Sequence, residues 1–162
     1  MKQPVNLKLK MSEIIYDVQN KTYLTGRSLE NGDNHSHVAN IQANDDDENA
    51  AQVLRSVTMA SAVLRNRLSE FMPAGNSGAT NDIMTEADDV VYTLSMPSNF
   101  NTAVAQTMGE AAHQFIVATA VADWFAITAK GETSDYTAVA EASLKVLEEA
   151  LCKRSRPRRQ ES

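Results

Sequence analysis

The sequence predicts a mainly α-helical fold, a bundle of about four helices with a small two-stranded β element and a basic C-terminal tail. Four stretches carry apolar residues at helical spacing, and only two short segments alternate as a strand does. Positive charge is concentrated in the last ten residues. A chain of 162 residues favours one domain, which we expect over residues 1–152, with the tail over 153–162.

The first two elements are a strand and a helix. Residues 5–11 alternate apolar and polar side chains, which is typical of a half-buried strand. Ser12 follows as a plausible N-cap, and Gly26 can end the helix that it begins. One face of this helix collects Ile14, Ile15, Val18 and Thr22.

A long helix is expected between two flexible loops. Residues 29–44 are rich in Asn, His and Asp and show no periodicity, which predicts a loop. Acidic residues then open a helix over 44–71, where they favour the helix dipole. Pro73 stops that helix, and residues 73–88 form the second loop.

The second half of the chain supplies one strand and two helices. Residues 90–96 alternate, so we expect them to pair with residues 5–11 and to need helices packed on them. The helix that follows runs from Asn101 or Thr102 to Gly131 and is apolar on most sides, which indicates a central or partner-shared position. The last helix starts near 133–135. The expected core or interface anchors are Phe115, Trp124, Phe125 and Tyr136.

Charge is divided unevenly along the chain. Residues 153–162 hold five basic residues and one acidic residue, a net charge of +4. The remaining residues hold ten basic and 20 acidic residues, a net charge of −10. An acidic body argues against an ordinary duplex-DNA reader, whose folded face is usually basic, and fits a head-to-tail oligomer.

Features of secretion and membrane insertion are not expected. The lone Cys152 rules out an internal disulfide and fits a reducing compartment. The N-terminal stretch has no continuous apolar run of the kind found in signal peptides. The longest apolar segment, residues 115–127, is interrupted by Thr119 and Asp123.

Candidate chemical sites are weak. His35 and His37 lie near several acids, but zinc needs three or four convergent ligands. Glu110 and His113 are one helical turn apart with no nucleophile beside them, so a surface pair is the simpler interpretation. No phosphate-binding, dinucleotide-binding, nucleophile-elbow or zinc-protease motif occurs. We therefore expect no enzymatic activity, no cofactor and no metal.

The basic tail is the most informative segment. A solvated end, contact with nucleic-acid phosphates and insertion into an acidic neighbour are all compatible with it. Arginine suits the last two, because its planar guanidinium pairs with carboxylate and phosphate alike. The residues expected to bind a partner, such as a neighbouring subunit, are Lys153, Arg154, Arg156, Pro157, Arg158 and Arg159.

Three stretches resemble the head–tail connector (neck adaptor) proteins of tailed bacteriophages, of the kind found in phages and prophages of gut Bacteroidetes. They are LKMSEIIYDVQNKTYLTGRS, YTLSMPSNFNTAVAQTMGEAAHQFIVATAVADWFAIT and DYTAVAEASLKVLEEALCKRSRPRR, together about half the chain. The shared pattern is an alanine-rich helix with Ala-Asp-Trp, then a helix ending in an Arg-Pro tail. The polar loop over residues 29–44 departs from the family, because a minimal adaptor does not need one so long.

The resemblance implies a structural virion protein. Such connectors form a ring, typically of twelve copies, that bridges the portal to the tail and surrounds the DNA channel without binding the genome specifically. The resemblance also implies assembly in the host cytoplasm, a final position in the virion neck, and a C-terminal segment that docks on the portal. Alternatives are another neck or tail component, such as a tail-completion protein, a nucleic-acid-binding regulator that uses the tail, or an enzyme.

Overall fold

The structure is a computed structural model that describes residues 2–75 and 78–157. Within these residues it contains five α-helices, three short 3-10 helices and one two-stranded sheet, so the predicted mainly helical fold is confirmed. The elements in chain order are β1 (Gln3–Leu9), α1 (Met11–Ser28), α2 (His35–Ile41), α3 (Asp47–Leu68), η1 (Ser69–Phe71), β2 (Val90–Met96), η2 (Thr102–Val104), α4 (Ala105–Thr128), η3 (Lys130–Glu132) and α5 (Thr133–Leu151).

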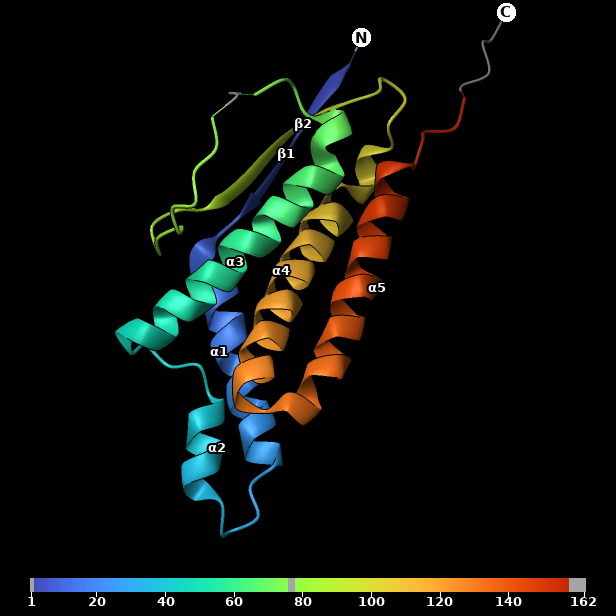
Figure 1. The fold of residues 1–162 in the computed structure, drawn as a ribbon. Coiled ribbons are helices and arrows are strands. Elements are labelled where there is room, and N and C mark those ends of the chain that lie inside the picture. Colours follow the sequence, from blue (N-terminus) through green and yellow to red (C-terminus); the bar gives the residue numbers. More distant parts are fainter. Residues whose placement is uncertain (1, 76–77, 158–162) are drawn as a thin grey trace, which may run out of the picture.

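Helix α4 is the centre of the fold, as its apolar sequence predicts. It packs against α1, α3 and α5, and Figure 1 shows it between α3 and α5 with α1 behind. Because neighbours cover it on several sides, half of its residues are buried, and alanines such as Ala112 and Ala118 let the neighbouring helices come close. The helix begins beyond Asn101, whose side chain accepts a hydrogen bond from the backbone of Ala103 at 3.0 Å.

The two strands pair antiparallel, as the alternation predicts. Their register runs from Gln3 opposite Met96 to Leu9 opposite Val90, and the buried side chains of both strands point to the helices. Met11, which the alternation assigns to the strand, instead begins α1, and its backbone N–H donates to Asp89 at 3.2 Å.

Tyr92 joins the sheet to α3. Its hydroxyl donates to the carbonyl of Ser61 at 2.7 Å, and the guanidinium of Arg65 lies 5.2 Å from its ring centre. Burial raises the pKa of the Tyr92 phenol well above its usual range, since the charged form would lose its water; the Arg65 charge and the hydrogen bond with Ser61 oppose the rise.

A short helix replaces part of the loop predicted over residues 29–44. Residues His35–Ile41 form α2, and Ile41 is wholly buried. Gly26 does not end α1, which continues to Ser28. A side chain at Gly26 would meet the Val38 carbonyl oxygen at 3.3 Å, so this glycine lets α2 approach α1 closely. Tertiary contacts therefore stabilise a helix that the local sequence does not predict.

The segment between η1 and β2 has no helix or strand among its described residues, in agreement with the loop predicted over 73–88. Its second half lies on α3. Arg55 donates to the carbonyl of Asn81 at 2.7 Å, and the backbone of Met84 donates to the Thr58 hydroxyl at 3.0 Å.

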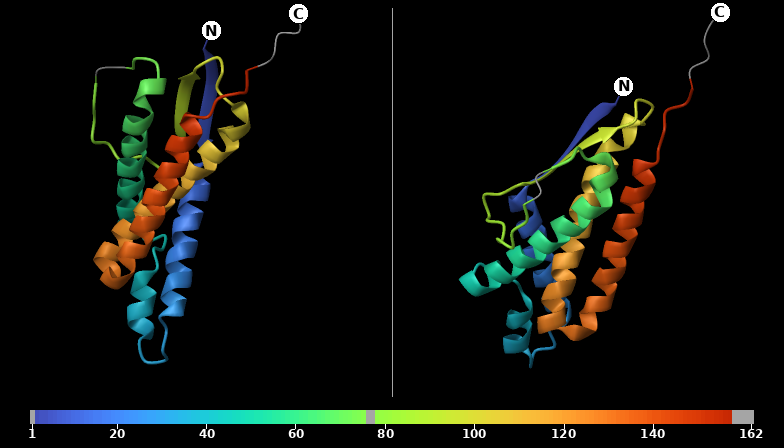
Figure 2. Two further views of the ribbon diagram at one scale, coloured as in Figure 1. Left: turned by 90° about the vertical axis from the view of Figure 1, so that its right-hand side faces the viewer. Right: turned by 45° about the horizontal axis from the view of Figure 1, so that its top comes forward.

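The two ends of the described chain lie at the same end of the molecule. Figure 1 and both views of Figure 2 show the start of β1 beside the segment that leaves α5, with α2 at the opposite end. Helix α5 carries the chain back along α4 from the η3 turn.

Candidate functional site

The root of the basic tail is attached to the body. Phe100 and Arg154 form an antiparallel β-bridge. The backbone N–H of Ser155 donates to the carbonyl of Asn99 at 2.7 Å, and that of Asn101 donates to the carbonyl of Lys153 at 3.2 Å. The tail therefore leaves the fold from a fixed position beside the start of α4.

The basic side chains of the tail have different surroundings. Arg154 donates to the carbonyls of Leu151 and Lys153 at 2.9 and 3.0 Å, so it caps the C-terminal end of α5. Arg156 and Pro157 are exposed, and the tail runs away from the body there (Figures 1 and 2). Lys153 is exposed, and Arg158 and Arg159, the remaining basic residues expected to bind a partner, lie outside the described residues.

The four expected aromatic anchors belong to the interior of the bundle. Phe115, Trp124 and Phe125 are buried, and Tyr136 is partly buried against them. The rings of Phe125 and Tyr136 are 5.4 Å apart at 57°, and the Tyr136 hydroxyl lies 3.0 Å from that of Thr25. The Trp124 indole N–H donates to the carbonyl of Ile41. These contacts make them packing residues, with no ring free to stack on a nucleic-acid base.

His113 pairs with a different acid from the one that the sequence predicts. Its Nε2 lies 2.6 Å from Oδ2 of Asp17 on α1, whereas Glu110 accepts from Gln106 at 3.0 Å. His113 and Asp17 are 96 positions apart, so no local pattern could have paired them.

His113 and Asp17 both line a polar groove of about 720 Å³. Its walls are residues 6–10 at the end of β1, the first turns of α1 and the N-terminal half of α4. Among the described residues that line the groove there is no serine, threonine or cysteine, so none of them offers the His113–Asp17 pair a hydroxyl or thiol to activate. The groove is therefore a candidate for binding a partner. Its residues Glu13 and Gly109 were missed as site residues, because they come from separate helices that only the folded chain brings together.

The other titratable candidates do not assemble into a centre. His35 bonds Glu30 at 2.7 Å, and His37 is exposed. Over residues 2–75 and 78–157, no three of the His, Cys, Asp and Glu side chains gather as metal ligands do. Burial raises the pKa of the Asp123 carboxyl above its usual value, and a hydrogen bond with Ser56 opposes the rise. Cys152 is an exposed thiol.

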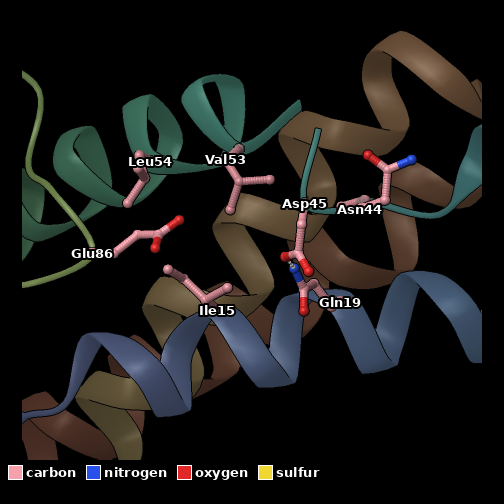
Figure 3. Close-up of a pocket in the computed structure, with 9 residues that line it drawn as sticks. Ile15, Gln19, Asn44, Asp45, Val53, Leu54 and Glu86 are labelled. Carbon is pink, nitrogen blue, oxygen red and sulfur yellow. Dashed lines mark hydrogen bonds between the residues drawn. The ribbon is translucent and has the colours of Figure 1, made fainter. Parts of the chain in front are cut away.

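A small cavity lies between α1 and α3. Figure 3 shows Ile15 and Gln19 on α1 facing Val53 and Leu54 on α3, with Glu86 entering from the loop. The cavity measures about 10 Å³, which is room for no more than one water molecule. It cannot hold a substrate.

The chain matches no protein-family model, and comparison with curated proteins and with solved structures gives no match either. Among the described helices, none has both the length and the apolar character needed to cross a bilayer.

Proposed function

We propose that this chain is a structural, non-enzymatic virion protein, a ring-forming head–tail connector that bridges portal and tail around the DNA channel. One observation carries the proposal: a basic segment with a fixed root projects from one end of an acidic helical body. A segment held in this way can be presented to a partner at little further cost in conformational entropy at its root.

The uneven distribution of charge supports the proposal that the protein surrounds DNA without binding it tightly. Residues 1–152 carry a net charge of −10, and a wall of that sign repels phosphate and lets a duplex slide. The cations needed for docking are kept in the tail, away from the body. In this proposal the protein acts as a ring of about twelve copies in the virion neck, a number that comes from the family resemblance.

The nucleic-acid-binding regulator remains the alternative to be tested. Arg154 is already bonded to the end of its own helix, which leaves fewer free cations for phosphate than the sequence offers. Each phosphate contact releases counterions, so a regulator would hold duplex DNA with a steep dependence on salt.

The test is a pull-down of the full-length protein by two baits, the portal protein from the same genome and a generic duplex DNA. We expect portal binding and no DNA retention at low salt. Arg156→Glu/Arg158→Glu should weaken portal binding and leaves the hydrogen bonds of Ser155 in place.

The matched control is Arg27→Glu/Lys145→Glu, which changes the net charge equally at exposed sites away from the tail. It should bind the portal as the unaltered protein does. Retention by DNA without portal binding would reject the connector and favour the regulator.

A further inference from the structure

We propose that the groove between β1 and α4 binds the basic tail of a second copy of this chain, as an extended strand along the free side of β1. This inference rests on the proposed ring and assigns the tail to the contact between neighbouring subunits, so that loss of Arg156 and Arg158 weakens portal binding by weakening the ring. Four features of the described residues lead to it: an open strand edge, an acidic wall, a glycine without an internal role, and the direction of the tail.

The open edge belongs to β1. Within the described residues β1 pairs only with β2. In an antiparallel pair every second residue directs its N–H and C=O away from its partner strand, and the groove opens along residues 6–10. An added strand would satisfy these groups, which is how extended peptides commonly bind to a sheet edge.

The helical side of the groove carries carboxylates. Glu13 and Glu110 line it from α1 and α4, and α4 packs on β1. The lining lysines, Lys8 and Lys10, lie along the strand edge; Lys8 is on the outer face of the sheet and forms an ion pair with Asp89 at 3.8 Å. A strand added here would turn alternate side chains toward the acidic wall.

The tail has the matching alternation. Arginines occupy positions 154, 156 and 158, so an extended tail carries all three on one side. Arg154 is bonded at the end of α5, which leaves Arg156 and Arg158 for Glu13 and Glu110. Arginine and carboxylate can form paired hydrogen bonds, and Pro157 between them is tolerated on an edge strand when its nitrogen faces outward.

Gly109 points to close approach by another chain. It lies inside α4 and lines the groove, and a Cβ built on it meets no atom within 4 Å. A helix-interior glycine is less stable than alanine, and here nothing among the described residues requires it. The backbone of a second chain lying against α4 would need the space that a side chain at position 109 would fill.

The direction of the tail favours a second copy over its own groove. The bridge between Phe100 and Arg154 fixes the root, and the described part then runs away from the body (Figures 1 and 2). Tail and groove are different surfaces, so the contact is head to tail and closes into a ring if the rotation between subunits allows.

The experiment titrates a fluorescein-labelled peptide of residues 153–162 against the full-length chain carrying Arg156→Glu/Arg158→Glu, which removes competition from its own tail. Fluorescence polarisation should show saturable binding. Gly109→Leu in the receptor should weaken binding at least about tenfold, because the leucine fills the groove. Thr107→Leu, at an exposed position of α4 outside the groove, should leave the affinity unchanged.

A charge exchange separates recognition from damage to the fold. Glu13→Lys/Glu110→Lys, placed in a receptor that keeps its natural tail, should abolish binding of the natural peptide and create binding of a peptide with Arg156→Glu/Arg158→Glu. Equal binding by the Gly109→Leu and Thr107→Leu receptors, or no binding by any receptor, would overturn the inference. So would a peptide that binds duplex DNA but not the protein. Portal capture without peptide binding would reject only this inference and leave the connector standing.

Discussion

The indole N–H of Trp124 donates a hydrogen bond to the backbone carbonyl of Ile41, and this bond joins the central helix α4 to the short helix α2. Trp124 is 6% exposed, and Ile41 is wholly buried. A carbonyl at the end of a seven-residue helix thus obtains a partner that the helix cannot supply. The order of residues 35–41 depends on a side chain more than 80 positions away.

Trp124→Phe should destabilise the protein by about 1–3 kcal/mol. The phenyl ring keeps much of the packing but leaves the buried Ile41 carbonyl without its donor. Chemical denaturation followed by circular dichroism measures the change. Hydrogen exchange should accelerate first in α2. Hydrogen exchange that accelerates equally in α3 and α5 would show that Trp124 does not stabilise α2 in particular.

Two glycine-to-alanine changes should have different effects. Gly109→Ala meets open space and should stabilise the subunit by about 0.5–1 kcal/mol through helix propensity. Gly26→Ala gains the same propensity but meets the Val38 carbonyl oxygen at 3.3 Å, so its net effect should be smaller or destabilising. Thermal unfolding of the two variants side by side tests this, and equal stabilisation would contradict the close packing of α2.

Tyr136→Phe should cost about 0.5–1.5 kcal/mol, because it removes the hydrogen bond with Thr25 and retains the packing on Phe125. Tyr16→Phe is the control, since Tyr16 is 63% exposed and should change the free energy of unfolding by less than about 0.5 kcal/mol. Urea denaturation distinguishes the two. Equal losses in both variants would mean that the bond between Tyr136 and Thr25 contributes nothing.

Asp123→Asn should stabilise the protein slightly at pH 7. Burial raises the pKa of the Asp123 carboxyl, so ionisation costs more in the folded state than in the unfolded chain. As pH falls through the raised pKa, the folded state takes up a proton first and the natural protein gains stability. The advantage of the variant should therefore shrink toward acid pH. The effect is small because Asp123 keeps contact with water. An advantage that is constant between pH 7 and pH 4 would contradict this origin.

Most of the fold follows from the hydrophobic pattern. The alternation of residues 90–96 and the apolar surface of α4 specify a half-buried strand and a central helix, because burial on one side or on all sides has a direct signature in sequence. Helix α2 has no such signature. Its only wholly buried side chain is Ile41, and its stability comes from Gly26 and Trp124, which the chain brings together only after folding.

The candidate site could be predicted in part. The basic tail is visible as a run of charge, but its attachment through Asn99 and Phe100 depends on how α5 lies against α4. The groove could not be predicted, since it forms where α1, β1 and α4 converge. The pairing of His113 with Asp17 shows the same limit: helical spacing favours Glu110, whereas the packed helices bring the acid of α1 closer.

The pairing of β1 with β2 has a consequence for how the chain reaches its native state. Leu9 pairs with Val90, 81 positions further along, so the sheet cannot close until most of the chain is available. During synthesis β1 leaves the ribosome before β2 and must wait for it, while α1 and α3 can already form from local contacts. The unpaired strand is then exposed to other nascent chains. Pairing of β1 with β2 should be a late, slow step, and it leaves one edge of β1 unpaired within the described residues.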